Sequence, residues 1–596
     1  MHRRVNERKE AVVIYKQHQL PPLPIPPLNH TRDQLIQWLK PLLSREQWRK
    51  TTYVINRFFQ PNGVAEKLQQ KLYEWKKSRS GSWLAPFWDD LYLKNRDSLP
   101  LSTNFNILLE NEAYKHRYTM VEFAGIISYL VAKLYHKIID GKVKQDTFRG
   151  KPLDIDQYKY FFRSVRIPQR RRDAIYVSPF DKKNNYIVLL YKNYIYKVPV
   201  TRKDGTIYQS SDIIAAIRSA IWQERHEGIN VNIFTAAKRD KAEKVYRLLN
   251  RSKVNQRILQ TIARALVVIS LDEESESSEE AIKHLMLHPN NKYFDKTIQI
   301  VITKYGHIGF NIEHATVDGT AINTVIRYIS NGLSNHTLLD NHSFEKIHVE
   351  KMSWELTKNL KETLYRIQAN YLSRIKNYHL LSKIFTDFGA TCIKQMNISP
   401  DAFFHIALQL AKYRTYGQFK SVYEPVNVRF FRGGRTECAR ATSMEKRRLV
   451  EAIEDGNVST RDLYEMMQKA SCAHRRRIQQ CQKGYGIERH LLGLEQMYYL
   501  FGNELGIQKL PEIFTDEGYL ALRHDFLSTS GTVYKDAKYR MFAPVVSDGH
   551  GIAYFLLDDV ISINISSFTH NQDEGKQLMK HLFKALKELK TIALSG

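Results

Sequence analysis

The sequence predicts a mixed α/β protein, because stretches with helical periodicity alternate with short runs of β-branched and apolar residues. The chain has 596 residues, of which 43% are hydrophobic and 11% aromatic. This length exceeds what one hydrophobic core supports and suggests two or three domains, and the apolar content is sufficient to build them. No internal repeat of fixed period occurs along the chain.

The N-terminal region is predicted to be helical after a proline-rich segment. Residues 20–28, LPPLPIPPL, must be extended, because proline fixes φ and restricts the residue before it. Three stretches with helical periodicity follow, at Thr31–Leu43, Arg45–Gln60 and Val64–Lys77. Ser44 is a candidate N-cap for the second of them. A Ser/Gly break at 78–82 leads into an aromatic stretch at 83–92, near which we place a domain boundary.

The middle of the chain mixes strands with helices. Residues 186–191 and 194–200 are expected to form a β-hairpin with Lys192 and Asn193 as its turn. Two further strands are predicted at Thr297–Thr303 and Ile308–Glu313, joined by a turn that contains Gly306. His314 therefore follows the end of a strand, where a rigid sheet can direct a side chain into a cleft.

The second half is predicted to be mainly helical. We expect a long helical stretch over 343–385, an amphipathic helix at Asp401–Tyr416, a strand at Val560–Ile565 and a closing helix at Gln572–Lys590. The acidic segment 272–280, DEESESSEE, is interpreted as a solvated loop or a helix start.

The formal net charge of +28 implies attraction to polyanions, namely nucleic acid, anionic lipid or a phosphorylated cofactor. The clusters Arg170–Arg172 and Arg475–Arg477 carry no DNA- or RNA-reading motif around them, so a solvated basic surface is favoured over a nucleic-acid site. No run of about 18–20 apolar residues occurs, as a transmembrane helix would require. A basic tail at 1–18 lacks the apolar segment of a signal peptide, so a cytoplasmic location is expected.

The four cysteines, Cys392, Cys438, Cys472 and Cys481, show no CxxC spacing and no histidine at metal-ligand distance in sequence. We therefore expect thiols that are buried or incidental, and no metal site.

The sharpest local feature is His314-Ala-Thr-Val-Asp318-Gly. An imidazole can accept a proton from a hydroxyl or thiol near neutral pH and return it later. The carboxylate four residues on can anchor a cation or the loop. A lone histidine after a strand is more often structural than catalytic, so this motif by itself favours the structural interpretation.

Other motifs resemble the choline/carnitine acyltransferase family, and they occur in the order that this family shows. They are PLNHTRD at 27–33, WLAPFW at 83–88, Arg166-Ile-Pro with Asp173, YFDKT at 293–297, FNIEH at 310–314, Ser399-Pro-Asp, Tyr423-Glu, GRTE at 434–437, ERHLLGL at 488–494, LSTS at 527–530 and DGHG at 548–551. The resemblance runs from about residue 20 to residue 570.

This resemblance implies two similar α/β domains, each like chloramphenicol acetyltransferase with a mixed sheet packed against helices, and an active-site tunnel at their interface. The first domain would span 76–355 and carry His314. The second would combine 19–75 with 356–596 and carry the substrate and coenzyme A motifs. The implied protein is a carnitine O-acyltransferase of fatty acid metabolism, with coenzyme A as co-substrate and no permanent cofactor, and it is a monomer.

The resemblance also implies roles for individual residues. His314 would be the general base, Ser530 the oxyanion donor, and Asp318 a partner of Arg489. Carnitine would meet Tyr423, Thr436, Arg489, Ser528 and the aromatic face of Phe542. Coenzyme A would meet Lys394, Asp401 and Glu424. Thr436 favours carnitine over choline, which has no carboxylate to bind.

Three positions depart from the family pattern. Ala390 replaces a lysine expected to bind coenzyme A, and Gly531 and Pro425 replace the usual Gln and Ser. Arg540 falls at the gate of the acyl pocket, where a large residue would exclude a long chain, so a short-chain preference is expected. Arg540 could instead pair with an acidic acyl group or turn outward. Two alternatives stay open: a non-catalytic protein that binds coenzyme A or polyanions, and choline O-acetyltransferase.

Overall fold

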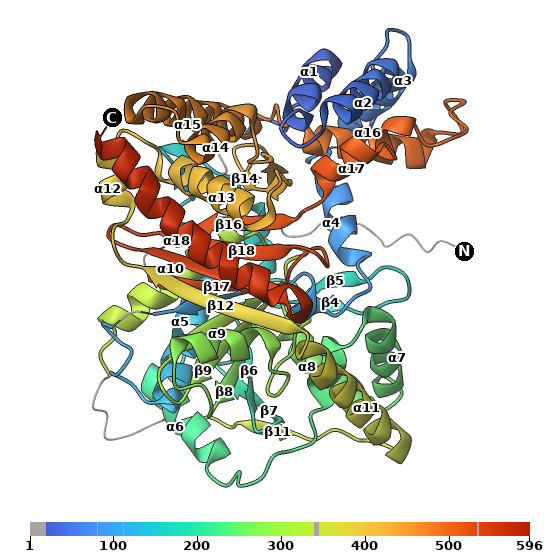
Figure 1. Ribbon diagram of the computed structural model, residues 1–596. Helices are drawn as coiled ribbons and strands as arrows, with labels where there is room; N and C mark the ends of the chain where they lie inside the picture. Colours follow the sequence, from blue (N-terminus) through green and yellow to red (C-terminus); the bar gives the residue numbers. More distant parts are fainter. Residues whose placement is uncertain are drawn as a thin grey trace. The chain divides into compact units, whose positions relative to one another are not determined.

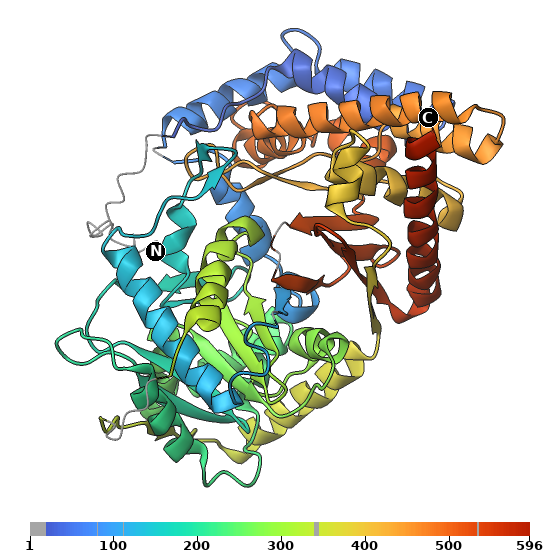
Figure 2. The same cartoon turned by 90° about the vertical axis from the view of Figure 1, so that its left-hand side faces the viewer.

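A computed structural model describes residues 20–79, 81–110, 112–338, 345–532, 534 and 536–595 (Figures 1 and 2). The basic tail predicted at 1–18 lies outside the described residues. The chain divides into two compact units, one with residues 92–372 and the other with 21–91 and 373–596. Each unit holds a mixed sheet packed with helices, which confirms the predicted α/β class.

The first unit is built on a sheet whose strands within the unit run in the order β11-β7-β6-β8-β9-β10-β1. Their bounds are β1 Phe105–Leu109, β6 Tyr186–Tyr191, β7 Tyr194–Pro199, β8 Val268–Asp272, β9 Ile298–Thr303, β10 Ile308–Ile312 and β11 Glu350–Met352. The pairs β6·β8 and β8·β9 are parallel and the others antiparallel. Every residue of β1, β8, β9 and β10 is buried, as expected for central strands covered on both faces.

Helices and small strands complete this unit. The helices are α5 Met120–Ile139, α6 Ser210–Ile221, α7 Arg239–Leu249, α8 Lys253–Arg264, α9 Ser278–Leu287, α10 Gly319–Asn335 and α11 Lys358–Ile375, with 3₁₀ turns at Leu99–Leu101, Asp156–Tyr160 and Val231–Ala236. The short strands are β2 Thr147–Phe148, β3 Lys151–Pro152, β4 Ser164–Ile167 and β5 Ala174–Val177. Helix α5 packs on β8 and β9, and α9 packs on β1 and β10.

The second unit contains a five-stranded sheet in the order β12-β19-β18-β16-β13. The strands of this unit are β12 Tyr378–Phe385, β13 Val422–Tyr423, β14 Pro425–Asn427, β15 Thr436–Cys438, β16 Leu527–Thr532, β17 Ala537–Phe542, β18 His550–Leu556 and β19 Ile561–Phe568. The pairs β13·β16 and β16·β18 are parallel, whereas β14 and β15 form a separate antiparallel pair. The parallel order aligns Tyr423 with Ser528, and Ser528 with Gly551.

The helices of the second unit are α1 Leu28–Leu39, α2 Arg45–Phe58, α3 Val64–Lys77, α4 Ala85–Leu93, α12 Ala390–Gln395, α13 Pro400–Tyr416, α14 Met444–Asp455, α15 Thr460–Gln482, α16 Glu488–Phe501, α17 Glu517–Arg523 and α18 Gln572–Ser595, with 3₁₀ turns at Glu512–Phe514 and Thr569–Asn571. Helix α18, dark red in both views, lies along the sheet beside α13 (Figures 1 and 2). The core between them includes Phe404, Leu408, Ile563 and Leu586.

The predicted elements compare with the structure as follows. The three N-terminal helices, the hairpin, the strands before His314 and the closing helix are confirmed, and Ser44 caps α2 by accepting from the backbone N–H of Gln47. The long helical stretch predicted over 343–385 is wrong. Helix α11 accounts for only part of it, and residues 378–385 form strand β12, because they pair with β19 almost two hundred residues later. No local periodicity encodes such a partner.

Candidate active site

His314 lies two residues beyond strand β10, in the turn that leads to helix α10. Its ring Nδ1 donates to the carbonyl oxygen of Val317, 2.9 Å away, because a carbonyl can only accept. This bond holds the proton on Nδ1 and makes Nε2 the basic nitrogen of the neutral ring. The rings of Tyr92 and Phe105 pack on the imidazole at centroid distances of 4.9 and 4.7 Å. The side chain is 23% exposed, so it stays within reach of solutes.

Asp318 occupies the N-cap position of α10 but does not cap that helix with its side chain. Gln157 binds it twice instead. The amide nitrogen of Gln157 donates to Asp318 Oδ2 at 2.9 Å, and the backbone N–H of Asp318 donates to Gln157 Oε1 at 2.7 Å. Asp318 Oδ1 lies 3.9 Å from the Nδ1 atom of His314. The carboxylate is therefore fixed beside the imidazole ring.

A buried ionic network supports the strand end that carries His314. Glu313, the residue before it, accepts from Arg166 at 2.9 Å, and Arg166 also donates to Asp173 at 2.8 Å. Arg239 links Asp173 to Asp295 at 2.6 and 2.7 Å. All five side chains are completely buried. The motifs around Arg166, Asp295 and Glu313 thus form one scaffold beneath the histidine.

In the second unit, Arg489 contacts two other residues predicted to bind carnitine, Tyr423 and Thr436. Its Nη2 donates to the hydroxyl of Tyr423 at 2.9 Å, and its Nε donates to the carbonyl oxygen of Thr436 at 3.0 Å. The guanidinium also lies over the ring of Trp88, 4.1 Å from the ring centroid. Burial raises the pKa of Tyr423, so its hydroxyl keeps its proton and can donate.

Ser528 and Ser530 lie on β16, two residues apart, and so point to the same face of the sheet. Ser528 is buried, whereas Ser530 is half-buried. Phe542 ends β17, and its ring borders Gly551, where an added Cβ would lie 3.0 Å from Phe542 Cε2. Because Gly551 aligns with Ser528, and Ser528 with Tyr423, the phenylalanine belongs to the same region of the unit.

Glu437 was not predicted from the sequence as a site residue. It follows Thr436 and accepts from the backbone N–H of Arg489 at 3.2 Å and from that of Cys438 at 2.8 Å. Burial raises the pKa of Glu437 to about 7. An added Cβ on Gly486 would lie 2.2 Å from the Glu437 side chain, which shows how closely the chain before α16 packs on this carboxyl.

Two of the residues predicted to bind coenzyme A meet in a second cluster, in which Glu424 and His474 are buried and Asp401 is partly exposed. Asp401 accepts from Tyr554 at 2.7 Å, and the ring of His474 lies 3.1 Å from Asp401 and 3.5 Å from Glu424. Burial raises the pKa of Glu424 well above its ordinary value, and burial lowers that of the neighbouring Lys446 to about 7.

Lys394 is exposed on α12, apart from these contacts, and Ala390 is buried at the start of that helix. Arg540, predicted at the acyl-pocket gate, is 6% exposed on β17, and burial lowers its pKa to about 10. Asp318 and Arg489 lie in different units, so their pairing and the shared tunnel remain predictions.

Sequence reasoning missed Gln157, Val317 and Glu437. Gln157 stands 161 residues before Asp318, in a 3₁₀ turn without a motif, so no local signal marks it. Glu437 was part of the motif at 434–437, and its place beside Thr436 was the signal that could have drawn attention to it.

Among the described residues, no helix is long and apolar enough to cross a membrane. The four cysteines form no disulfide: Cys438 and Cys481 are buried, Cys392 is half-buried and Cys472 is exposed.

Comparison with known proteins identifies the class. The profile described as "Choline/Carnitine o-acyltransferase" matches residues 23–585. Human carnitine O-acetyltransferase is 29% identical over 98% of this chain and 95% of its own length. Choline O-acetyltransferase of Danio rerio is 28% identical over 96% of this chain and 93% of its own length. Carnitine O-palmitoyltransferase 2 of Bos taurus, a mitochondrial protein, is 27% identical over 98% of this chain and 93% of its own length.

Solved structures show more distant likenesses. The trichothecene 15-O-acetyltransferase TRI3 from Fusarium sporotrichioides matches with a TM-score of 0.39 and 11% identity, over 84% of this chain and 94% of its own. The wax ester synthase/diacylglycerol acyltransferase from Marinobacter aquaeolei VT8 matches with a TM-score of 0.32 and 10% identity, over 85% of this chain and 98% of its own.

The chain is an acyltransferase. The match over nearly its whole length shows that it belongs to the choline/carnitine O-acyltransferase family.

Proposed function

We propose that this protein is a carnitine O-acyltransferase that moves a short acyl group reversibly between coenzyme A and carnitine. The observation that carries the proposal is the cluster around Arg489, with Tyr423 and Thr436 beside it. A guanidinium with a tyrosine hydroxyl beside it suits a carboxylate, which carnitine has and choline lacks. The similarity to carnitine O-acetyltransferases over almost the full chain agrees with this choice.

In the proposed reaction, Nε2 of His314 removes the proton from the carnitine hydroxyl. The oxygen then attacks the thioester carbonyl of acyl-coenzyme A and forms a tetrahedral oxyanion. Ser530 donates a hydrogen bond to this oxyanion, where such donors are most effective. The carbon–sulfur bond breaks, the acyl group stays on carnitine, and the thiolate of coenzyme A takes the proton from His314. No acyl-enzyme forms.

Further residues bind the substrates in this proposal. Tyr423, Thr436, Arg489 and Ser528 bind carnitine, and the ring face of Phe542 receives its trimethylammonium group, which cannot donate hydrogen bonds. Lys394, Asp401 and Glu424 meet coenzyme A. Asp318 acts as a positioning residue for His314 or Arg489. The large side chain of Arg540 limits the acyl pocket to short chains.

The two compact units correspond, in this proposal, to the two acyltransferase-like domains implied by the family resemblance. The boundaries 76–355 and 19–75 with 356–596, the monomeric state and the cytoplasmic location are proposed with them.

The test mixes purified protein with acetyl-coenzyme A and L-carnitine and follows the release of free thiol. His314→Ala is measured beside it, with His226→Ala as a control because that histidine is exposed. General-base catalysis contributes about 10²–10⁴-fold, so a loss of that size is expected in His314→Ala alone.

Acceptor and donor are then varied. Turnover with choline but not with carnitine would make the protein a choline O-acetyltransferase, the activity named for its Danio rerio relative. Binding of coenzyme A without turnover for any donor from acetyl to palmitoyl would overturn the proposal in favour of a non-catalytic binding protein.

A further inference from the structure

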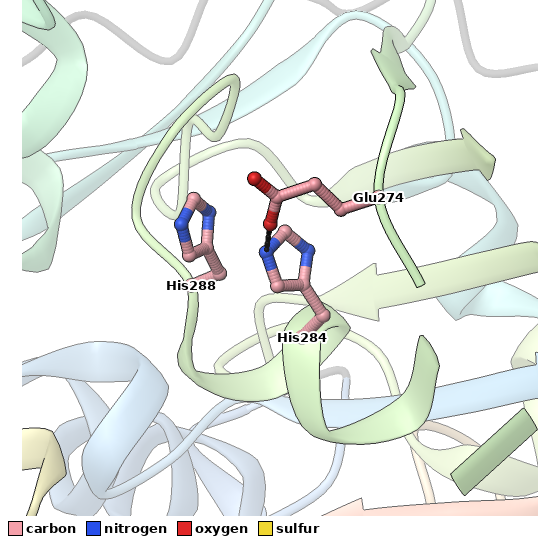
Figure 3. Close-up of side chains that lie close together, drawn as sticks. All are labelled: Glu274, His284 and His288. Atoms are coloured by element: carbon pink, nitrogen blue, oxygen red, sulfur yellow. Dashed lines mark ion pairs between the residues drawn. The ribbon is translucent and has the colours of Figure 1, made fainter. Parts of the chain in front are cut away.

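A cluster of potential metal ligands lies in the first unit, outside the residues proposed for acyl transfer. Glu274, His284 and His288 each place one ligand atom so that all three atoms lie within 4.8 Å of one another. Figure 3 shows the Glu274 carboxylate directed toward the two neighbouring imidazole rings. We propose that this cluster binds a divalent transition-metal ion of the zinc class, a role that the acyl-transfer reaction does not require.

Helical spacing places the two histidines together. His284 is in the last turn of α9, and His288 caps the C-terminus of that helix, four residues later. Residues four apart lie on one face of a helix, and two histidines at this spacing can share one ion. Their rings stack with centroids 3.8 Å apart and planes inclined by 20°, so one ring must turn about its Cβ–Cγ bond before a nitrogen of each ring can point at one ion. The negative end of the helix dipole also favours a cation at this point.

Asp272 orients His284 as the partner of a metal ligand does. Its Oδ2 accepts from His284 Nδ1 at 2.8 Å, which fixes the proton on Nδ1 and directs the lone pair of Nε2 away from Asp272. Lys292 lies 3.6 Å from the same oxygen and balances the charge of Asp272, which is not itself a proposed ligand. The backbone N–H of Glu274 donates to Asp272 Oδ1 at 3.1 Å and fixes the loop that presents the carboxylate.

The contact between Glu274 and His284 resembles a pair of ligands rather than a hydrogen bond. Glu274 Oε2 approaches His284 Nε2 to 2.9 Å, yet Nε2 makes no hydrogen bond of acceptable geometry. Two ligands of one ion are expected to lie close together but off each other's hydrogen-bond axis. The buried Nδ1 atom of His288 also has no hydrogen-bond partner among the described residues.

The ligand types and the local charge select the ion. Two imidazoles and one carboxylate, with a position left for water, form a ligand set that zinc accepts. The neighbouring acidic residues Glu273, Glu276, Glu279 and Glu280 make this loop a local negative patch in a chain of net charge +28, which would attract a divalent cation.

The other group of potential ligands, Asp401, Glu424 and His474, is less suited to an ion. Lys446 Nζ lies 2.8 Å from His474 Nδ1, and Tyr554 already donates to Asp401. Both side chains are therefore already engaged in contacts within the fold.

The test uses the full chain, freed of metal with EDTA and titrated with Zn²⁺ in competition with a chromogenic chelator. One zinc ion should bind per chain with a dissociation constant below about 10 µM, and the ion should raise the melting temperature. His284→Ala/His288→Ala should abolish this binding. His226→Ala/His348→Ala, which removes two exposed histidines, should leave it unchanged.

Single substitutions keep the test decisive if the double variant fails to fold. Glu274 is 68% exposed, so Glu274→Ala should fold normally and bind zinc at least about tenfold more weakly. Asp272→Asn should weaken binding about 10–100-fold, as loss of an orienting carboxylate does. Equal zinc affinity in the parent and in Glu274→Ala, or no zinc binding by the parent, would overturn the proposal. The approach of Glu274 to His284 would then be a structural contact only.

Discussion

Gln157 and Asp318 are joined by two hydrogen bonds, one from the Gln157 amide to Asp318 Oδ2 and one from the Asp318 backbone N–H to Gln157 Oε1. Both residues are buried. The pairing fixes the carboxylate of Asp318 beside the ring of His314. It also fixes the backbone of Asp318, which immediately precedes α10. The turn that carries His314 therefore depends on a side chain from a distant part of the sequence.

We expect Gln157→Leu to lower kcat about 10–100-fold with little change in the KM for carnitine, because a small displacement of a catalytic group is enough for such a loss. Steady-state kinetics of the folded fraction, determined by circular dichroism, checks this. Gln157→Asn keeps the amide but shortens its reach, so its kcat should lie between that of the parent and that of Gln157→Leu. An unchanged kcat per folded molecule would show that Gln157 serves stability alone.

The ion pair of Glu313 and Arg166 gives a prediction about stability. Replacing Glu313 by Gln leaves the buried guanidinium with one carboxylate fewer, so we expect the free energy of unfolding to fall by about 3 kcal/mol. Urea unfolding measures it. Glu465 pairs with Arg461 on the surface, and Glu465→Gln should cost less than about 1 kcal/mol. Equal losses in the two variants would show that the buried network contributes no more than a surface pair.

Glu437 gives a prediction about pH. Its pKa is about 7 in the folded chain, against an ordinary value of 4.5. Between these values the folded state holds a proton that the unfolded state has lost, so stability falls as pH rises through this window. Glu437→Gln removes the effect. The variant should be more stable than the parent by about 3 kcal/mol at pH 8 and equal to it at pH 4, as measured by urea unfolding at both values. A stability difference that does not vary with pH would contradict the assignment.

The sequence predicted those parts of the molecule that local patterns encode. Amphipathic periodicity located α2, α3 and α18, and the turn residues Lys192 and Asn193 located the hairpin, where both have positive φ. Strand β12 was missed because its eight residues are stabilised by β19, not by their own pattern. The predicted histidine follows a strand as expected, but it is held by the backbone carbonyl of Val317, and its neighbour Asp318 is held by a long-range contact with Gln157. Neither a backbone carbonyl nor a long-range contact produces a pattern of residues that can be recognised in the sequence.

The metal ligands proposed in the first unit were missed for a related reason. The cysteines form no metal-binding pattern in the sequence, whereas the pair at 284 and 288 meets a glutamate ten residues before His284 only after α9 folds back onto the loop that follows β8. The spacing of the histidines was visible in the sequence, but the acidic segment 272–280 was interpreted as a solvated loop or a helix start, and α9 does begin within it. The first residue of this segment, Asp272, is in fact buried and bound to His284.

The last prediction concerns acyl-chain length and rests on the proposed function. Arg540 is buried on β17, so its long side chain occupies space within the fold instead of extending into solvent. Removing it should open that space, and we expect Arg540→Gly to raise kcat/KM for octanoyl-coenzyme A relative to acetyl-coenzyme A by at least about tenfold, since each buried methylene contributes about 0.8 kcal/mol. The comparison is made across a series from acetyl to palmitoyl.

Lys538→Gly is the control, because it puts the same glycine into the same strand. Adjacent strand residues alternate in direction, so residues 538 and 540 share a face. The acyl series then distinguishes a local opening at 540 from a general loosening of β17. If both variants shift the preference equally, or if the parent already prefers palmitoyl-coenzyme A, Arg540 does not set the chain length.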